Sequence, residues 1–544
     1  MIVDRRARLL AGVATLGMLV ATVPAIGQND APESLLPPGF DQPVSSPTPT
    51  PSPAPSAPAP SNSGSGQRPA QDSTLSPPPG PSPMVQPLPG EQEDTQSDAG
   101  RDDDGTDGLD DSLDAKLASA QSLPPGAQRS LTLIGVLTPT EGGMAAQSLG
   151  RAGGAYTTAL LRATRGALVS RWGTILLRRT LLSRLQTPAG VNGADWAAER
   201  ASLLARVGDA DGSRQIVQSV DGPDFSARLM SVALNSYLAS ADPAGICPIL
   251  PFDPAKREAS EWLLARAICS GLAGQQSSAA EQVDRAARGN VGDPIDRLLA
   301  EKVIGAGVNG RRAVTIEWDD VEELSPWRFG LGLATGVEPP ERLYKTAGRV
   351  FQAWRSRAPM LPFSSRMAGA DLAAAMGIMS HDQMVDLYGA AYDDPGAGDD
   401  LRARAALLRA AYVQQAPADR LAAMQSLWDR SDNAFVRYSA HVLTAEAAAR
   451  FPVSSDFVDA SDDLIASMLA GGFDRSAARW SSIVEKGSRS WAMIALSMPG
   501  ADRPVPEDAL DSFVDDDSSQ DMRASRFLVA GLAGLGRING QDLQ

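Results

Sequence analysis

The chain has 544 residues, of which 43% are hydrophobic and 5% aromatic, and 65 acidic side chains against 49 basic ones give a net charge of −16. Residues 28–130 alone carry 15 acidic and 4 basic side chains, so much of the negative charge lies ahead of the region that can build a core. This balance excludes nucleic acid as a partner, because binding to phosphates requires clustered cationic side chains.

Residues 1–27 have the pattern of a secretory signal. Arg5, Arg6 and Arg8 precede the apolar run Leu9–Gly27, the order of segments that a signal peptide requires. We therefore expect a periplasmic or secreted protein. An uncleaved membrane anchor is the competing interpretation, because the apolar run comes close to the length that spans a bilayer.

Residues 28–125 are predicted to form a disordered linker. Ala31–Gly90 contains 19 prolines in 60 residues, a composition that stays extended and cannot bury a core. An acidic block follows at 91–114. Four of its residues fall at positions 1, 5, 6 and 12 of a calcium loop: Asp103, Asp107, Gly108 and Asp114. Because Gly105 stands at position 3, where a ligand is needed, we expect a solvated linker and no metal site.

A short connecting segment at 126–150 leads into a sequence whose pattern is helical to its end. Gly or Pro interrupts this pattern every 12 to 25 residues, which is the length of a helix and a turn. We expect an all-α fold with at most two or three strands. Two helical lobes, 151–325 and 340–535, are predicted on either side of the Gly- and Pro-rich stretch Ser325–Leu343.

The stretch Asp195–Val217 returns in looser form as Glu261–Val283, 66 residues later. Five pairs of positions are identical: Trp196 and Trp262, Arg200 and Arg266, Ala201 and Ala267, Gly208 and Gly274, and Val217 and Val283. The spacing suits a large buried residue, the tryptophan, near the start of a helix and a glycine in the left-handed conformation at its end. A third helix is predicted after each hairpin, at Pro223–Ser240 and at Asp293–Ile304.

Two later segments, Ser365–Tyr392 and Leu401–Trp428, follow the same helix–turn–helix plan. An amphipathic helical hairpin cannot bury its apolar face alone, so we expect the hairpins to stack as an α-solenoid. In this plan the chain resembles the tetratricopeptide-like class of α/α-repeat proteins, which implies an extended surface for binding a partner.

Three further segments carry a second resemblance: Ser170–Leu182, Ala194–Asp221 and Ala241–Leu250. With them, the organisation of the chain is similar to that of exported proteins of alphaproteobacteria with no assigned activity, some of which are labelled as related to antifreeze glycopeptides. The Pro-rich tract Ala31–Gly90 lacks regular Ala-Ala-Thr repeats, so we do not expect antifreeze activity.

Cys247 and Cys269 are the two cysteines of the chain. An exported protein with an even number of cysteines favours a disulfide, and the prolines between these two mark a loop that returns to the next repeat. We predict that they are bonded and that the bond stabilises the fold by roughly 3 kcal/mol. The alternative is two separately buried thiols.

The segment Ala155–Gln186 is predicted to be one helical stripe with no acidic residue. It carries six arginines: Arg162, Arg165, Arg171, Arg178, Arg179 and Arg184. A basic amphipathic helix with Trp172 could dock on an anionic envelope surface, in which case several guanidinium groups should be exposed with no carboxylate within about 4 Å. Alternatively, these arginines are solvated or pair with acidic neighbours in the fold.

The remaining residue patterns predict no catalytic residue, cofactor or metal. His381 and His441 stand far apart with no Cys beside either, so they do not form a zinc site. We expect His381 at a helix start and His441 packed on a helix. Gly305–Gly310 fits a dinucleotide-binding fingerprint but follows a helical segment, so we interpret it as the turn that ends that helix.

We therefore expect a non-enzymatic exported scaffold that binds an envelope protein or polymer. It would contact a membrane only if the signal remains uncleaved or the arginine-rich helix docks. The alternative is a cell-envelope enzyme acting on cell-wall polysaccharide, which would need two carboxyl groups about 5 to 9.5 Å apart across a groove.

Overall fold

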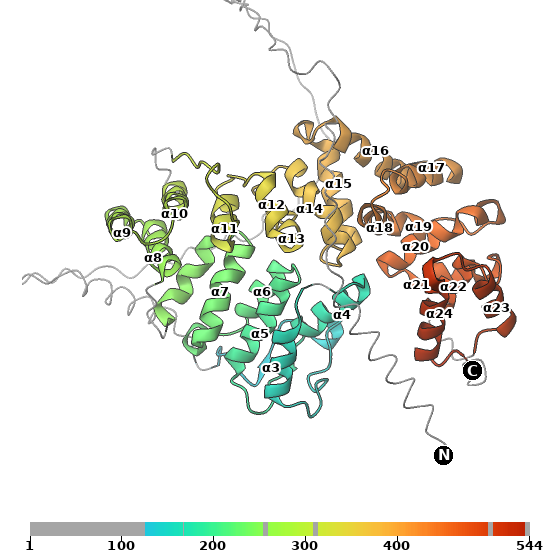
Figure 1. Ribbon diagram of the computed structural model, residues 1–544, viewed down its shortest axis with the longest axis horizontal. Helices are drawn as coiled ribbons and strands as arrows, with labels where there is room; N and C mark the ends of the chain where they lie inside the picture. Colours follow the sequence, from blue (N-terminus) through green and yellow to red (C-terminus); the bar gives the residue numbers. More distant parts are fainter. Residues whose placement is uncertain are drawn as a thin grey trace, which may run out of the picture. The chain divides into compact units, whose positions relative to one another are not determined.

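The fold was analysed in a computed structural model, which describes residues 124, 126–166, 168–253, 259–307, 314–498 and 504–538 (Figure 1). Within these ranges the chain folds into the 22 α-helices α3 to α24, several 3₁₀ turns and one two-stranded sheet. This confirms the all-α prediction and the small number of strands. The expected signal, the Pro-rich linker and the calcium-like pattern lie outside the described residues.

The sheet joins the start of the described chain to the end of the arginine-rich segment. Strand β1 (Leu133–Ile134) pairs antiparallel with β2 (Leu185–Gln186), with Leu133 opposite Gln186. The pairing encloses the helices α3 (Gly154–Ala163) and α4 (Arg171–Leu182) in one loop of chain.

The single helix expected over Ala155–Gln186 was wrong, because α3 and α4 are separate. Gly166 adopts φ +91°, a left-handed conformation that an α-helix cannot contain. Ser170 then caps the second helix, its Oγ accepting a hydrogen bond from the Gly173 N–H at 3.2 Å.

The two echoed segments fold alike, as the sequence predicts. The first copy forms three helices: α5 (Gly193–Arg206), α6 (Ala210–Val217) and α7 (Ala227–Ala239). The second forms α8 (Ser260–Leu272), α9 (Gln276–Arg288) and α10 (Pro294–Gly307), and in both copies the three helices pack on one another. Trp196 and Trp262 are both buried, and Gly208 and Gly274 both have left-handed φ angles, of +100° and +85°.

The stretch Ser325–Leu343, expected between two lobes, contributes to the first hydrophobic core. Helix α11 (Pro326–Ala334) packs on α7, so closely that a Cβ at Gly330 would lie 2.6 Å from the Leu238 carbonyl oxygen. This core continues through α12 (Glu341–Ala347) and α13 (Arg349–Arg355) to Leu361. The first hydrophobic core ends, and the second begins, at about residues 353–367.

The later helices build three further cores in chain order. The two later hairpins are confirmed as α14 (Phe363–Ala375) with α15 (His381–Asp393) and α16 (Asp399–Val413) with α17 (Pro417–Trp428). The chain continues through α18 (Ala434–Leu443), α19 (Ala445–Ala449), α20 (Ser461–Gly471), α21 (Asp474–Ala478), α22 (Arg489–Ser497), α23 (Glu507–Asp515) and α24 (Arg523–Gly534). Neighbouring helices such as α15 and α16 lie side by side (Figure 1).

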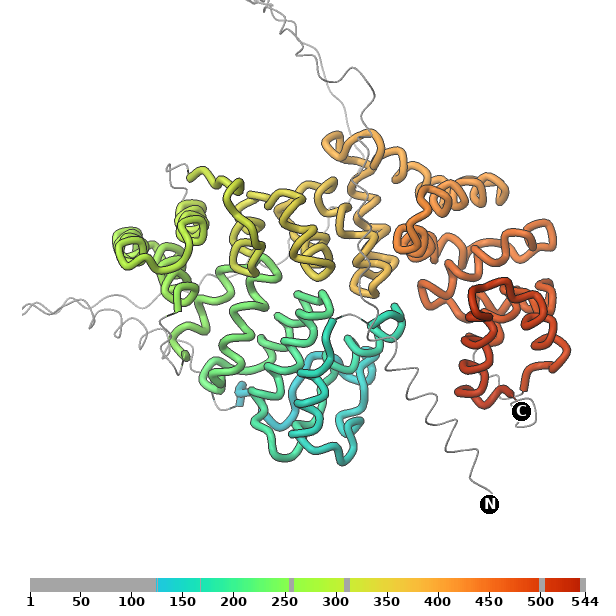
Figure 2. Tube along the Cα trace, in the orientation of Figure 1, coloured from blue at the N-terminus to red at the C-terminus, as the bar shows by residue number. Residues whose placement is uncertain are grey.

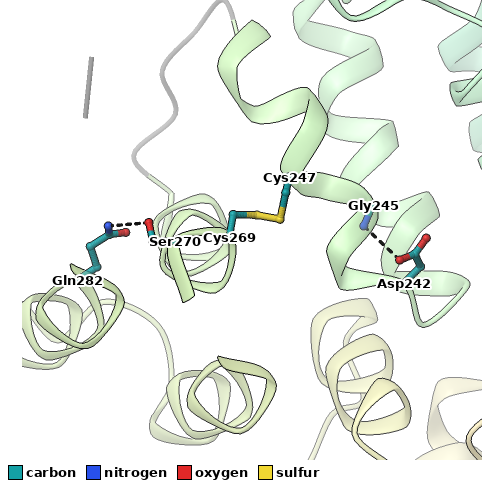
Figure 3. The surroundings of a disulfide bond; sticks show 6 residues. All are labelled: Asp242, Gly245, Cys247, Cys269, Ser270 and Gln282. Atoms are coloured by element: carbon teal, nitrogen blue, oxygen red, sulfur yellow. Dashed lines mark hydrogen bonds between the residues drawn. A yellow bond between two sulfur atoms is a disulfide. The ribbon is translucent and has the colours of Figure 1, made fainter. Parts of the chain in front are cut away.

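The predicted disulfide is present between Cys247 and Cys269, whose Cα atoms lie 5.4 Å apart (Figure 3). Cys247 belongs to a proline-containing 3₁₀ segment, Pro243–Phe252, and Cys269 to α8. That segment packs against both α7 and α8, so the bond fastens the connection between the two echoed units to the second unit.

Removing the disulfide is expected to lower the free energy of unfolding by roughly 3 kcal/mol, because the unfolded chain regains the freedom of a loop of 22 residues. We expect this loss for the double variant Cys247→Ala/Cys269→Ala in urea unfolding. Reduction of the wild type should give the same loss, and reduction of the double variant should give none. Equal stability of wild type and double variant would contradict the prediction.

Candidate docking surface

Exposed apolar side chains gather on α3, α4 and the turn between them. Of the sixteen large hydrophobic residues that are exposed in the described chain, six lie between residues 156 and 176: Tyr156, Leu160, Leu168, Val169, Trp172 and Leu176. Val169 is 96% exposed and Tyr156 68%. An accumulation of this kind marks an interaction surface more often than single exposed hydrophobics do. We call these six residues, with the exposed arginines of the same segment, the α3–α4 surface.

Helix α4 has one buried face and one exposed face. Arg171, Thr174, Leu181 and Leu182 are buried. Positions i, i+4 and i+7 on the other face are exposed: Trp172 (43%), Leu176 (55%) and Arg179. These three positions share one side of an α-helix, so an aromatic ring, an aliphatic chain and a guanidinium group are presented together.

Both faces of α4 are attached to helices far away in the sequence, the buried face through Arg171 and the exposed face through Trp172. Arg171 donates from Nη1 to the carbonyl oxygens of Ala374 and Met379 and from Nε to that of Ala470, the last at 3.2 Å. Trp172 donates from Nε1 to the Leu469 carbonyl at 3.1 Å. Burial lowers the pKa of Arg171 to about 10, so the side chain stays charged at neutral pH. In Figure 2 the teal trace of α4 accordingly lies next to the orange trace of α20.

Two more of the six arginines bind acidic side chains of the first echoed unit. Arg178 lies 2.7 Å from Asp209, and Arg162 lies 2.7 Å from Glu199. Glu199 is fully buried and also pairs with Arg228 at 3.0 Å. Burial alone would raise the pKa of Glu199, but the hydrogen bonds from the two guanidinium groups lower it below its usual value.

The six arginines thus divide into two groups of three. Arg171 is buried, and Arg162 and Arg178 pair with carboxylates. The other three are exposed, and no carboxylate of a described residue lies within 4.0 Å of them: Arg165, Arg179 and Arg184. The sequence could show that the segment lacks acidic residues, but not that Glu199 and Asp209 would reach it from other helices.

The two histidines take positions that the sequence predicts. His381 is the first residue of α15, after Ser380, whose Oγ accepts from the Gln383 N–H at 3.2 Å. His441 is buried on α18, with Nδ1 3.0 Å from the Ser467 hydroxyl. Burial, with the positive charges of Arg489 and Arg437, lowers the pKa of His441 to about 4, so it is neutral at neutral pH.

Two pockets lie beside helices of the described chain, and each has few charged residues. One pocket, of about 650 Å³, lies open beside α3, with Arg162 as its charged residue. The other, of about 260 Å³, lies between α14 and α15 and has one carboxylate, Asp386. Among the described residues, no three His, Cys, Asp or Glu side chains are grouped as metal ligands would be. The described part of the chain also contains no helix with the length and apolar composition that a bilayer span needs.

The described chain is thus an all-α, disulfide-bonded protein whose segment 156–184 exposes both apolar and cationic side chains. No family model, curated protein or solved structure matches the chain.

Proposed function

We propose that this protein is a non-enzymatic, exported helical-repeat scaffold that docks through its α3–α4 surface on an anionic lipid surface of the cell envelope. The observation that carries the proposal is that one segment of the chain, residues 156–184, exposes six apolar side chains together with three arginines that have no carboxylate partner among the described residues.

The composition of the α3–α4 surface suits the boundary between lipid headgroups and acyl chains. Apolar side chains such as Trp172 and Leu176 gain free energy by leaving water, while guanidinium groups remain at the level of the phosphates. Helix α4 has 12 residues and is anchored along its inner face by Arg171. It would therefore lie along the surface, because it is too short to cross the bilayer.

The two echoed units support the proposal of a helical-repeat scaffold. Trp196 and Trp262 fill equivalent buried positions, and Gly208 and Gly274 end equivalent helices. Repeated units of this kind give an extended surface on which a partner can be held. A Pro-rich tether, as expected for residues 28–125, would hold the helical part near its attachment point and so raise its local concentration around a binding partner there.

Exchange of an exposed apolar pair that makes no hydrogen bond to other helices, Val169→Ala/Leu176→Ala, is expected to weaken binding to vesicles that contain phosphatidylglycerol by about tenfold. Each side chain would lose part of the roughly 1.5–3 kcal/mol that full burial provides. The measurement is co-sedimentation of the full chain with vesicles. The matched control is Val413→Ala/Phe527→Ala, which removes two exposed apolar side chains elsewhere and should bind as the wild type does.

The arginines are tested separately with Arg165→Gln/Arg179→Gln, whose control is the exposed Arg526→Gln. Only the first variant should lose binding, and the binding of the wild type should fall as salt rises. Equal binding to uncharged vesicles would overturn the proposal. Sedimentation with peptidoglycan but not with vesicles would overturn the choice of lipid as the partner.

A further inference from the structure

A second candidate site is the pocket between α14 and α15. Its volume is about 260 Å³, just below the range of roughly 300–1,000 Å³ that is usual for drug-sized ligands. Phe363, Met379 and Leu387 give it apolar walls, while Arg357 and Arg366 bring two guanidinium groups to it. The pocket therefore combines a small apolar volume with two guanidinium groups.

The charge of Arg366 is not neutralised within the described fold. Its side chain is partly buried, its Nε donates to the Ser356 carbonyl at only 3.4 Å, and its guanidinium carbon lies 5.7 Å from the centre of the Phe363 ring. No carboxylate of a described residue comes within 4.0 Å of it. Burial, and then the like charge of Arg357, lower the pKa of Arg366. A partly buried cation of this kind gains from an added anion.

Arg357 contributes less free charge, because it already forms an ion pair with Asp211 on α6. Its Nε is nevertheless buried and has no hydrogen-bond partner. Asp386 also lines the pocket and is exposed. The pocket thus holds one paired arginine, one unpaired arginine and one carboxylate.

We propose that this pocket binds a small monocarboxylate with a compact apolar body. The carboxylate would take two parallel hydrogen bonds from the planar guanidinium group of Arg366, the geometry in which arginine binds carboxylates best. The apolar body would lie against Phe363, Met379 and Leu387. A dianion such as phosphate is disfavoured. Its second negative charge would be repelled by the Asp386 carboxylate, and Arg366 is the one unpaired arginine among the described residues that line the pocket.

The test is isothermal titration of the full chain with hexanoate. The expected Kd is on the order of 1 mM, as suits a ligand of so few atoms. Two related probes divide the interaction: hexanol keeps the apolar body without the charge, and methylphosphonate dianion adds a second charge. Both should bind at least about tenfold more weakly than hexanoate if the guanidinium–carboxylate contact dominates.

Three variants locate the site. Arg366→Gln should weaken hexanoate at least about tenfold, since it removes the charged partner. Asp386→Asn should strengthen it, because it removes the opposing carboxylate. Arg526→Gln, an exposed arginine on α24, should leave it unchanged. If Arg366→Gln fails to fold, Arg366→Lys keeps the charge without the planar fork and should still weaken binding.

The proposal does not depend on the proposed lipid docking, because Val169→Ala/Leu176→Ala should leave hexanoate binding intact. Hexanol that binds as well as hexanoate would overturn the inference of a carboxylate site. Unchanged affinity in Arg366→Gln, or weaker binding in Asp386→Asn, would overturn its location.

Discussion

Arg200→Met is expected to destabilise the protein by about 4 kcal/mol, within the range for breaking a buried charged network. The side chain of Arg200 is fully buried on α5. It donates from Nε to the Leu181 carbonyl and from Nη1 to the Ile134 carbonyl, both at 2.8 Å, and from Nη2 to the Leu181 and Ser183 carbonyls. One guanidinium group thereby connects β1, the end of α4 and the following turn to α5.

Methionine fills much of the same volume but donates no hydrogen bond, so buried carbonyl oxygens at the end of α4 would lose their partner. Part of this loss is offset. Burial of the Arg200 charge away from water costs free energy and lowers the pKa of Arg200 to about 9, and methionine removes that cost. The measurement is urea unfolding monitored by circular dichroism. The control Arg165→Met changes an exposed arginine and should alter stability by less than about 0.5 kcal/mol. Similar losses in both variants would contradict the role given to Arg200.

The features of the fold that were predictable from the sequence are those that nearby residues decide. Gly208 and Gly274 end helices because glycine adopts a left-handed conformation without strain, and both do so at the expected positions. The disulfide was predictable because the chain has two cysteines and patterns of an exported protein. The break at Gly166 was not predicted. The helical spacing of apolar residues continues across Gly166, and one glycine is not enough to show that a helix ends there.

The buried arginines were not predictable, since their partners are carbonyl groups at helix ends that only the tertiary structure brings near. The last carbonyl groups of a helix have no partner within it, and its C-terminus carries partial negative charge. Several arginines outside the helix concerned donate to such groups: Arg206 to Leu161, Arg420 to Ala411 and Arg537 to Ala495. An arginine-rich sequence therefore indicated a docking face, although half of the six candidates hold the fold together.

Arg171→Met, the second large effect, is expected to detach α4 from the later helices at a cost of about 4 kcal/mol. Arg171 serves two helix C-termini at once, because Ala374 lies in the last turn of α14 and Ala470 in that of α20. Its third acceptor, Met379, lies in the turn before α15. Hydrogen exchange should report the loss locally, as faster exchange in α4 and at the end of α20 with little change in α8 to α10.

The contribution of Arg171 can be separated from that of Trp172 by a double-mutant cycle. Trp172→Phe removes the Nε1 hydrogen bond to the Leu469 carbonyl but keeps an aromatic ring on the exposed face. Both side chains attach α4 to the last turn of α20, so the two losses should not add. Once Arg171→Met has released α4, Trp172→Phe should cost about 1 kcal/mol less than it does in the wild type. Additive losses would mean that each residue holds a separate contact and that α4 does not dock as a unit.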